Sequence, residues 1–231
     1  MSKELLKEMA AKEALRLVKD GVVLGLGSGT TMRIFAKLLA KKVMEEGINI
    51  IVIPTSFDIE MLSIKLGLKV ASLSQYPRPD MAIDGADIVD ERLNLIKGGG
   101  AALAREKVVD YSAREYIIIA DESKLVKNIF SHKIPVEVLP FSWTSVTLFL
   151  KENLEAKAEI RMSREGKVGP ITTDNGNFII DVYIGKRGLS PAELEREVKQ
   201  VPGVVEVGIF SLKKPKKVIL GSASGVKVLT R

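Results

Sequence analysis

Short apolar runs alternate with helical patterns over the first 130 residues, and this alternation constrains the fold more than any other feature of the chain. Apolar runs without polar alternation are typical of strands that are buried on both faces of a parallel sheet. The runs expected to form strands are residues 22–27, 48–53, 68–73, 81–83, 93–96 and 116–120. The helices expected beside them are residues 4–18, 32–46, 57–66 and 101–113. Strands that alternate with helices predict an α/β domain in which helices cover a parallel sheet.

The pattern changes after Asn128, where strands and helices follow one another in a different order. The strands expected here are residues 134–139, 158–163, 178–184 and 204–210, and the helices are residues 143–154 and 191–201. Ser190, Pro191 and Glu193 form a typical helix start, with a capping serine, a proline at the first helical position and a glutamate in the capping box. The order strand, helix, strand, strand, helix, strand predicts a ferredoxin-like α+β domain.

The last segment contains one further apolar strand, residues 218–220, which we expect to return to the sheet of the first domain. We therefore expect one domain of residues 1–130 plus 211–231, into which a second domain of residues 131–210 is inserted.

Composition restricts the chemistry that is available. The 231 residues include no cysteine and a single histidine, His132. Without cysteine no disulfide or thiolate metal site can form, and Ser-His-Asp catalysis would require His132 to be placed for it. The net charge is +6, but Lys and Arg are scattered and only residues 213–217 form a short basic run. We therefore expect a solvated lysine-rich surface rather than nucleic-acid binding, with mild steering of a small anionic substrate as a further alternative.

Targeting signals are not evident in the sequence. Residues 1–13 mix charged and apolar side chains and lack the apolar core of a signal peptide. No apolar stretch is long enough to span a bilayer. We expect a soluble cytoplasmic protein.

The chain also has only two glutamines and many Lys and Glu residues, which suggests the hypothesis of a thermophilic source.

A glycine-rich turn, residues 25–31, joins the first strand to the next helix. Backbone N–H groups at a helix start attract an anion, and glycine lets the backbone approach it. A dinucleotide site is disfavoured, because Thr30 occupies the place of the third glycine in GxGxxG and no acidic residue ends the following strand. The turn predicts either a phosphate site, with hydroxyl donors from Ser28, Thr30 and Thr31, or a tight turn without a ligand.

An acidic segment directly follows the fourth strand. Its residues are Asp84, Gly85, Ala86 and Asp87, followed by Asp90 and Glu91. Open parallel sheets bind ligands beyond the carboxyl ends of their strands, so these carboxylates are candidates for a site. A polar loop with a capping aspartate is the simpler alternative. Magnesium is conceivable through oxygen ligands, but without an imidazole cluster we favour a site that holds no metal.

Lys97 is followed by three consecutive glycines, Gly98, Gly99 and Gly100, at the start of a predicted helix. Such a run is costly in conformational entropy, and close approach of the backbone to a ligand explains it better than packing. Glu106 lies about two turns into the helix, where it could face the same cavity or be an ordinary surface glutamate. Lys124, just past the strand of residues 116–120, could hold an anion or be an exposed turn lysine.

These four segments all follow expected strands, so they can converge on one edge of a single sheet. Together they supply hydroxyl and backbone donors, two lysines and several carboxylates. This set suits proton abstraction next to a carbonyl, in which a glutamate is the base and a lysine stabilises the developing ene-diolate oxygen. The residues alone therefore predict an anion-binding α/β enzyme that transfers protons without a metal.

The same segments resemble those of the ribose-5-phosphate isomerase A family. The matching stretches are GLGSGTT, IPTSF, DGADIVD, KGGGAALAREK, ADESK, VEVLPF, PGVVEVGIF and LGSASGVKVL. The resemblance spans essentially the whole chain. It implies an α/β fold with a Rossmann-like parallel-sheet domain and an inserted α+β ferredoxin-like domain. It also implies a homodimer or homotetramer, without metal or cofactor, that interconverts D-ribose 5-phosphate and D-ribulose 5-phosphate in the pentose phosphate pathway.

The resemblance implies roles for individual residues as well. Glu106 matches the base that moves a proton between C1 and C2 of the open-chain sugar. Asp84 and Asp87 match carboxylates that handle hydroxyl protons and ring opening, and Lys97 matches a catalytic lysine at the reacting end. The residues implied to bind substrate are Lys7, Ser28, Gly29, Thr30, Thr31, Asp84, Gly85, Ala86, Asp87, Lys97, Gly98, Gly99, Gly100 and Lys124.

Two positions depart from the usual family pattern. GSGTT stands in place of the commoner GTGST, and Ala101 stands in place of a fourth glycine. Two other classes of function stay open: an amino-sugar phosphate isomerase or deaminase of related fold, and a non-catalytic sugar-phosphate-binding domain of a regulator. The regulator would need a DNA-binding segment, and none is evident in the sequence.

Overall fold

The computed structural model describes residues 1–163, 166, 168–184 and 188–230. Its largest sheet consists of β1 (Val23–Leu26), β2 (Ile51–Pro54), β3 (Lys69–Val70), β4 (Met81–Asp84), β7 (Glu115–Asp121), β14 (Lys217–Ser222) and β15 (Gly225–Thr230). The parallel strands lie in the order β3-β2-β1-β4-β7-β14, and β15 pairs antiparallel with β14 at the edge. This is the strand order of dinucleotide-binding sheets, which confirms the expected Rossmann-like architecture.

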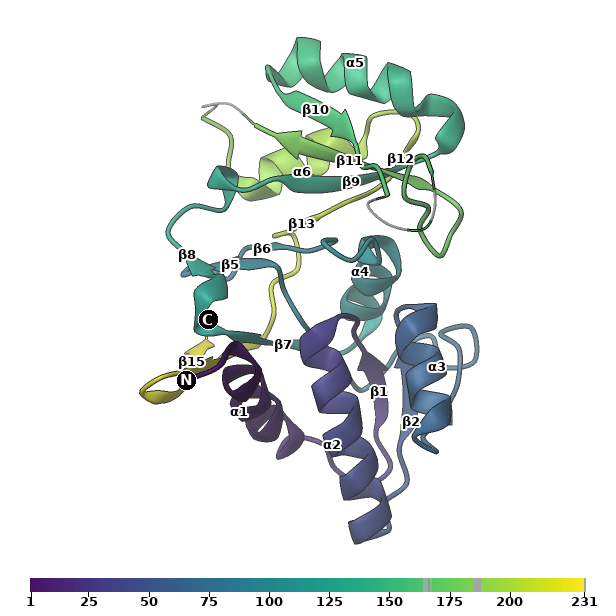
Figure 1. The fold of residues 1–231 in the computed structure, drawn as a ribbon, viewed down its shortest axis with the longest axis vertical. Helices are drawn as coiled ribbons and strands as arrows, with labels where there is room; N and C mark the ends of the chain where they lie inside the picture. The colour runs from purple at the N-terminus through teal and green to yellow at the C-terminus, as the bar shows by residue number, and fades with distance from the viewer. Residues whose placement is uncertain (164–165, 167, 185–187, 231) are drawn as a thin grey trace.

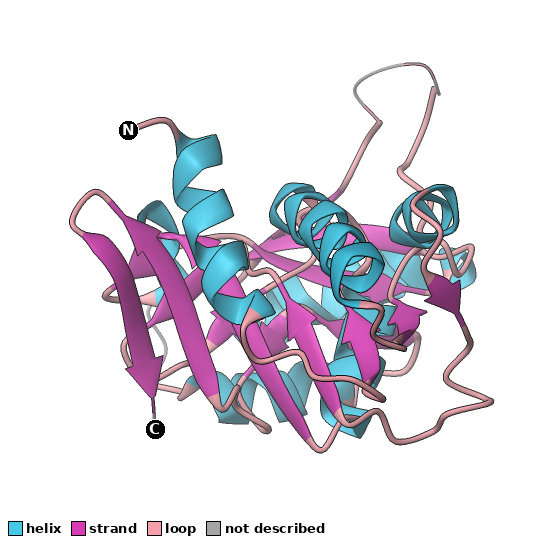
Figure 2. Ribbon diagram, turned by 90° about the horizontal axis from the view of Figure 1, so that it is seen from below, coloured by secondary structure: helices cyan, strands magenta, loops and turns pink. Residues whose placement is uncertain are grey.

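Helices cover both faces of this sheet (Figure 2). They are α1 (Lys3–Leu15), α2 (Thr30–Glu46), α3 (Phe57–Lys65) and α4 (Leu103–Ser112). The side chains of Ser2 and Ser56 cap α1 and α3 by accepting hydrogen bonds from backbone N–H groups in the first turn. Gly47 ends α2 in the left-handed conformation. Within the described residues, no helix is long and apolar enough to cross a membrane.

The core explains why the strands are continuously apolar in sequence. On β7, Ile117 and Ile119 pack in the cluster that contains the buried faces of α1 and α2. The alternate residues Ile118 and Ala120 pack in a second cluster together with Val109 of α4. A strand that is buried on both faces has no polar side to display, so its sequence shows no alternation.

The second sheet consists of β9 (Ile134–Val138), β10 (Lys157–Ile160), β11 (Phe178–Tyr183) and β12 (Val204–Val207), with α5 (Trp143–Leu154) and α6 (Pro191–Lys199). Its strands are antiparallel in the order β10-β11-β9-β12, which is the ferredoxin-like arrangement that the element order predicted. The predicted capping box is present, because Ser190 Oγ accepts from Glu193 N and Glu193 Oε2 accepts from Ser190 N.

A small third sheet lies between the other two (Figure 1). It consists of β5 (Ile88–Asp90), β6 (Leu95–Ile96), β8 (Leu125–Val126) and β13 (Ile209–Phe210). The single strand expected over residues 204–210 is therefore wrong, because the chain leaves the second sheet at Gly208 and enters the third. A Cβ on Gly208 would lie 2.5 Å from Lys97 O and 2.7 Å from Pro135 O, so only glycine permits this crossing.

The C-terminal segment was predicted in part. Its expected strand does return to the first sheet, as β14 beside β7. The single-strand expectation missed β15, whose residues are mostly exposed at the sheet edge and therefore show no buried-strand pattern. The acidic segment, predicted as a loop, also contains β5. Three short 3-10 turns complete the described elements: η1 (Glu122–Lys124), η2 (Ile129–Ser131) and η3 (Pro140–Ser142).

Lys107 of α4 joins the two domains through a buried ion cluster. Its ammonium lies 3.0 Å from both Glu195 Oε1 of α6 and Glu206 Oε1 of β12. It also donates to Val207 O at 2.6 Å and Ile209 O at 2.8 Å. These contacts bind α4 to the point where the chain crosses between sheets, so α4 is fixed to both domains.

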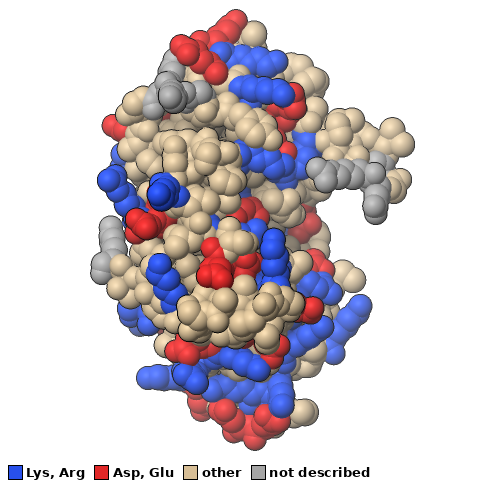
Figure 3. All heavy atoms as spheres, turned by 60° about the vertical axis from the view of Figure 1, so that its left-hand side comes forward, with Lys and Arg blue, Asp and Glu red and all other residues tan. Residues whose placement is uncertain are grey.

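Charged side chains are mixed on the surface. On the face shown in Figure 3, Lys and Arg lie among Asp and Glu. No continuous basic stripe is visible over the described residues of that face, and this distribution supports the expectation of a solvated lysine-rich surface.

The N-terminal helix packs very closely on the last parallel strand. A Cβ on Gly221 of β14 would lie 1.8 Å from Leu6 O of α1. We expect Gly221→Ala to displace α1 and to lower the free energy of unfolding by about 3 kcal/mol, the upper range for overpacking. Denaturant unfolding would measure this. Gly188→Ala, where a Cβ meets nothing within 4 Å, is the matched control. Equal stability of the two variants would contradict the close packing of α1 on β14.

Candidate active site

A cavity of about 370 Å³ opens at the carboxyl ends of β1, β2, β4 and β7. Its lining residues are Lys7, Ser28, Gly29, Thr30, Thr31, Ser56, Asp58, Gly85, Ala86, Asp87, Lys97, Gly98, Gly99, Gly100, Ala101, Ala102, Glu106, Lys124 and Asp174. Every residue predicted from the sequence to form the site lines this cavity except Asp84, which lies directly behind it. The four segments therefore converge on one cavity, but not from the edge of a single sheet: three of them follow strands of the parallel sheet, whereas Lys97 and its glycines follow β6 of the third sheet.

Lys97 is the central cation of the site. Its side chain is only 2% exposed, and its ammonium donates a hydrogen bond to Gly85 O at 2.6 Å. The same Nζ lies 2.9 Å from Asp84 Oδ2 and 3.3 Å from Glu106 Oε1. Burial alone would lower the pKa of Lys97, but the surrounding carboxylates outweigh burial and raise it. Lys97 is therefore a permanent cation at one wall of the cavity.

Asp84 is fully buried and supports Lys97 from behind. Its Oδ1 accepts a hydrogen bond from Gly85 N at 2.6 Å. Burial raises the pKa of Asp84, and the charge of Lys97 opposes this rise. The space for the carboxylate exists because residue 27 is glycine: a Cβ on Gly27 would lie 1.9 Å from Asp84 Oδ1. This glycine of the glycine-rich turn therefore makes room for the Asp84 side chain rather than for a bound ligand.

Glu106 is positioned as a base. It lies on α4, is 5% exposed and lines the cavity. Burial raises its pKa most and the charge of Asp84 raises it further, while Lys97 opposes them, with a resulting pKa of about 8. A carboxylate with a pKa near neutral pH can accept a proton and return it within one reaction cycle.

A further acid, Asp110, lies one turn beyond Glu106 on the same helix. It is 1% exposed, and neither of its carboxyl oxygens has a hydrogen-bond partner among the described residues. Burial, reinforced by the charge of Asp84, raises its pKa well above the usual range. Sequence patterns do not reveal this residue, because an aspartate in a helix is usually on the surface.

Asp87 and the glycine run line the cavity together and contact each other. Asp87 Oδ2 accepts a hydrogen bond from Gly99 N at 2.6 Å, and a Cβ on Gly99 would lie 2.6 Å from Asp87 Oδ1. Gly98 has φ +102°, which side chains rarely adopt. Packing and backbone conformation thus account for these two glycines, and only Gly100 borders open space.

The start of α2 forms the anion-binding part of the cavity. Gly29 is its N-cap residue and has no side-chain cap, so the first N–H groups of the helix are available to an anion. Lys7 of α1 reaches this point and donates to Thr30 Oγ1 at 2.8 Å, and Lys124 of η1 lines the same cavity. Ser28 Oγ donates to Ser56 Oγ at 2.6 Å, so this hydroxyl stabilises the turn rather than pointing to a bound anion.

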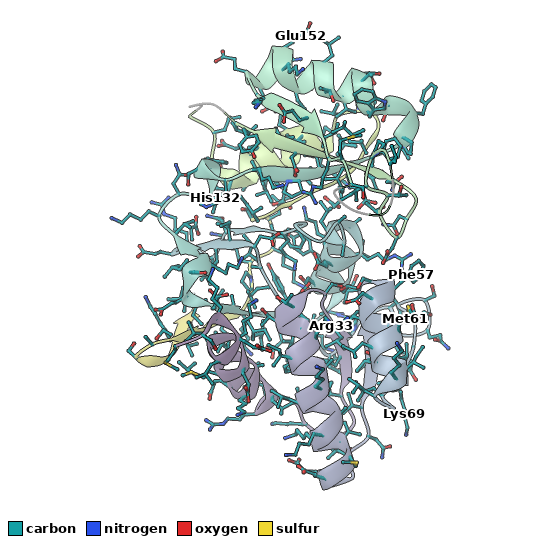
Figure 4. The ribbon with its side chains drawn as sticks, in the orientation of Figure 1. Arg33, Phe57, Met61, Lys69, His132 and Glu152 are labelled. Carbon is teal, nitrogen blue, oxygen red and sulfur yellow. The ribbon has the colours of Figure 1, made fainter. Side chains whose placement is uncertain are left out.

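Several lining residues were not predicted. Ser56 is the N-cap residue of α3, and Asp58 lies in the first turn of the same helix. Asp174 comes from the connection between β10 and β11 of the inserted domain. Conversely, Asp90 does not line the cavity, and its Oδ2 accepts a hydrogen bond from Asn94 Nδ2 at 2.7 Å. His132, labelled in Figure 4, is not among the lining residues either. Within the described ranges, no group of three or more His, Cys, Asp or Glu is arranged to hold a metal.

Comparison with known proteins gives a consistent result. The family model described as ribose 5-phosphate isomerase A (phosphoriboisomerase A) matches residues 51–225. A ribose-5-phosphate isomerase A of Methanococcus aeolicus is 46% identical over 224 residues, which cover 96% of this chain and 93% of the relative.

Two solved structures also match over their full lengths. Ribose 5-phosphate isomerase A of Methanocaldococcus jannaschii superposes with a TM-score of 0.94 at 45% identity, and 100% of each chain is covered. A D-ribose-5-phosphate isomerase in complex with phospho-erythronic acid superposes with a TM-score of 0.95 at 44% identity, again over 100% of each chain. With a buried glutamate and lysine beside an anion-binding helix start, and with these matches in sequence and structure, the chain belongs to the ribose-5-phosphate isomerase A family.

Proposed function

We propose that this protein interconverts D-ribose 5-phosphate and D-ribulose 5-phosphate by proton transfer through an ene-diolate, in the pentose phosphate pathway. The observation that carries the proposal is the pairing of Glu106 with Lys97. A carboxylate with a pKa of about 8 lies 3.3 Å from a buried ammonium, and both line a cavity that begins at an uncapped helix N-terminus. This arrangement combines a base, a cation for a developing oxyanion, and an anchor for phosphate.

The phosphate binds at the start of α2, where the helix N–H groups, Lys7 and Lys124 supply positive charge. The open-chain sugar then extends toward Glu106, which removes the proton from C2 of the aldose. The electron pair moves into a C1–C2 double bond, and negative charge develops on O1 beside Lys97. Glu106 returns the proton to C1, and loss of the O2 proton completes the ketose.

The two aspartates take different parts in this scheme. Asp87 lines the cavity, and we assign it the transfer of the hydroxyl proton between O1 and O2 as well as ring opening. Asp84 is 0% exposed behind Gly27, so it acts on the substrate only through Lys97. It holds the ammonium in place and keeps it charged.

We further propose that the protein acts in the cytoplasm as a homodimer or homotetramer, as the family resemblance implies. An exposed apolar stripe on α3 supports association: Phe57, Met61 and Ile64 are 50%, 58% and 60% exposed. They are spaced so that they share one helix face, and Figure 4 shows Phe57 and Met61 on the outer side of α3.

The substrate is tested by an isomerisation assay on ribose 5-phosphate, glucosamine 6-phosphate and unphosphorylated ribose. We expect turnover of ribose 5-phosphate, a loss of at least about a hundredfold in kcat/KM without the phosphate, and full activity in excess chelator. Preference for glucosamine 6-phosphate would favour the amino-sugar enzyme. Binding of sugar phosphates without turnover would favour the regulator domain, and irreversible loss in chelator would indicate a required metal.

Glu106→Gln keeps the shape of the side chain but cannot accept a proton. We expect kcat to fall by about a thousandfold, while the Kd for ribose 5-phosphate from calorimetry stays within about threefold of the wild-type value. Glu45→Gln, an exposed change at the end of α2, is the control. A Glu106→Gln enzyme with near wild-type kcat would refute the assignment of the base.

The raised pKa of Glu106 predicts a pH dependence. The base must be unprotonated to act, and with a pKa of about 8 only about a tenth of it is unprotonated at pH 7. We therefore expect kcat/KM to rise about tenfold per pH unit below pH 8 and to level off above it. A profile that is flat between pH 6 and pH 8 would show that the base has an ordinary carboxylate pKa.

A further inference from the structure

The inserted domain contributes one described residue to the cavity, and it is an acid. All other lining residues belong to the segment from Lys7 to Lys124, whereas Asp174 lies in the turn between β10 and β11. Neither the family motifs nor the mechanism above uses this residue. Its place in the wall of the cavity raises the question of what it contacts when substrate is bound.

The turn that carries Asp174 is held firmly against the first domain. Asp174 Oδ2 accepts a hydrogen bond from Phe57 N at 2.7 Å, at the first residue of α3. Arg105, the neighbour of Glu106, donates to Asp174 O at 3.0 Å and to Asn175 Oδ1 at 2.8 Å. The Arg105 guanidinium also lies 4.5 Å from the centroid of the Phe57 ring. Figure 4 shows Phe57 at the end of α3 that faces the inserted domain.

The turn is also held in place by a residue of its own domain. Glu137 of β9 is 0% exposed, and its Oε1 accepts hydrogen bonds from three residues of the turn: Thr173 Oγ1 at 2.9 Å, Asn175 Nδ2 at 3.0 Å and Asn177 Nδ2 at 2.8 Å. A buried carboxylate with several donors fixes the backbone around it. The position of the Asp174 carboxylate is therefore set before substrate arrives.

Charge is distributed unevenly along the cavity. Lys124 follows β7, and Lys7 lies on α1, which packs against β7 and β14. Asp58 follows β2, and Asp174 is bonded to the first residue of the same helix. The strands lie in the order β7-β4-β1-β2, so the two ends are about 14 Å apart at ordinary strand spacing. The lysines of the cavity therefore lie toward one end, where we place the phosphate, and Asp174 lies toward the other, where Asp58 is paired with Arg33.

We propose that Asp174 is a specificity-determining residue that accepts a hydrogen bond from the hydroxyl end of the sugar and repels a second anionic group there. The proposal rests on the proposed function, because it takes the phosphate to lie at the end where these lysines are. Asp174 Oδ2 is bonded to Phe57 N, whereas Oδ1 has no hydrogen bond within the described chain and is free to accept one from the sugar. A phosphate or carboxylate on C1 would meet this carboxylate at close range, and like charges there disfavour binding.

The test compares two ligands that differ chiefly at C1. Ribitol 5-phosphate presents a hydroxyl there, and ribulose 1,5-bisphosphate presents a second phosphate. Calorimetry with Asp174→Asn should weaken ribitol 5-phosphate binding about fivefold to tenfold and tighten bisphosphate binding about tenfold, because the variant loses a charged acceptor and a repulsive charge.

Because the two affinities are expected to change in opposite directions, the test distinguishes a role in specificity from a merely structural role. Asp174→Asn keeps a side-chain oxygen that can accept from Phe57 N, and Asp174→Ser, which also offers a capping oxygen, is the second variant should the first fail to fold. Glu152→Gln, on the outer face of α5 (Figure 4), controls for net charge.

Two results would overturn the proposal. Equal weakening of both ligands would show that Asp174 has a merely structural role, and unchanged affinities for both would show that it contacts neither. Failure of the wild-type protein to isomerise ribose 5-phosphate would refute the proposed function, while the ratio of the two affinities would still test Asp174.

Discussion

One buried ammonium organises the site. Lys97 has two carboxylates and a carbonyl around its Nζ, and each element that supplies a partner is thereby fixed in relation to the others. The residue that carries it is also anchored through its backbone, because Lys97 N donates to Gly208 O at 2.9 Å at the point where the chain passes between sheets. The charge to which we assign stabilisation of the ene-diolate and the crossing that joins the two domains therefore depend on the same residue.

The electrostatics of this cluster explain how an ordinary glutamate becomes a useful base. Asp84, Glu106 and Asp110 are all buried around a single lysine, and one positive charge cannot compensate three negative ones in a medium of low dielectric. The cluster therefore holds protons more tightly than free carboxylates do, and Glu106, which lines the cavity, is placed to exchange a proton with a substrate. Burial is the largest cause of the raised pKa of Glu106, and the charge of the neighbouring Asp84 adds to it.

The sequence predicted what local patterns and family motifs encode. Apolar runs located the parallel strands because β7 and its neighbours are buried on both faces, and three of the site segments converged because parallel strands end at one edge. The expected strand before Lys97 is instead β6 of the third sheet, and the pattern of apolar residues does not distinguish the two sheets. The role of Gly27 could not be predicted, since its close contact is with Asp84 on another strand. Lys107 and Asp174 were missed for a similar reason: each acts across the domain boundary, through partners far away in the chain. The edge strand β15 produced no signal because it buries little.

The close packing of Leu6 against Gly221 has a consequence for the order in which the protein can mature during synthesis. Lys7, the next residue, lines the cavity and donates to Thr30 Oγ1, and β14 is one of the surfaces that hold α1 in place, beside α2 and β7. A nascent chain that has completed α2, α4 and the whole inserted domain still lacks this surface until residues 217–222 leave the ribosome. Residues 3–15 and 217–222, which are far apart in the sequence, thus pack together, so a chain truncated before β14 loses one of the supports of Lys7.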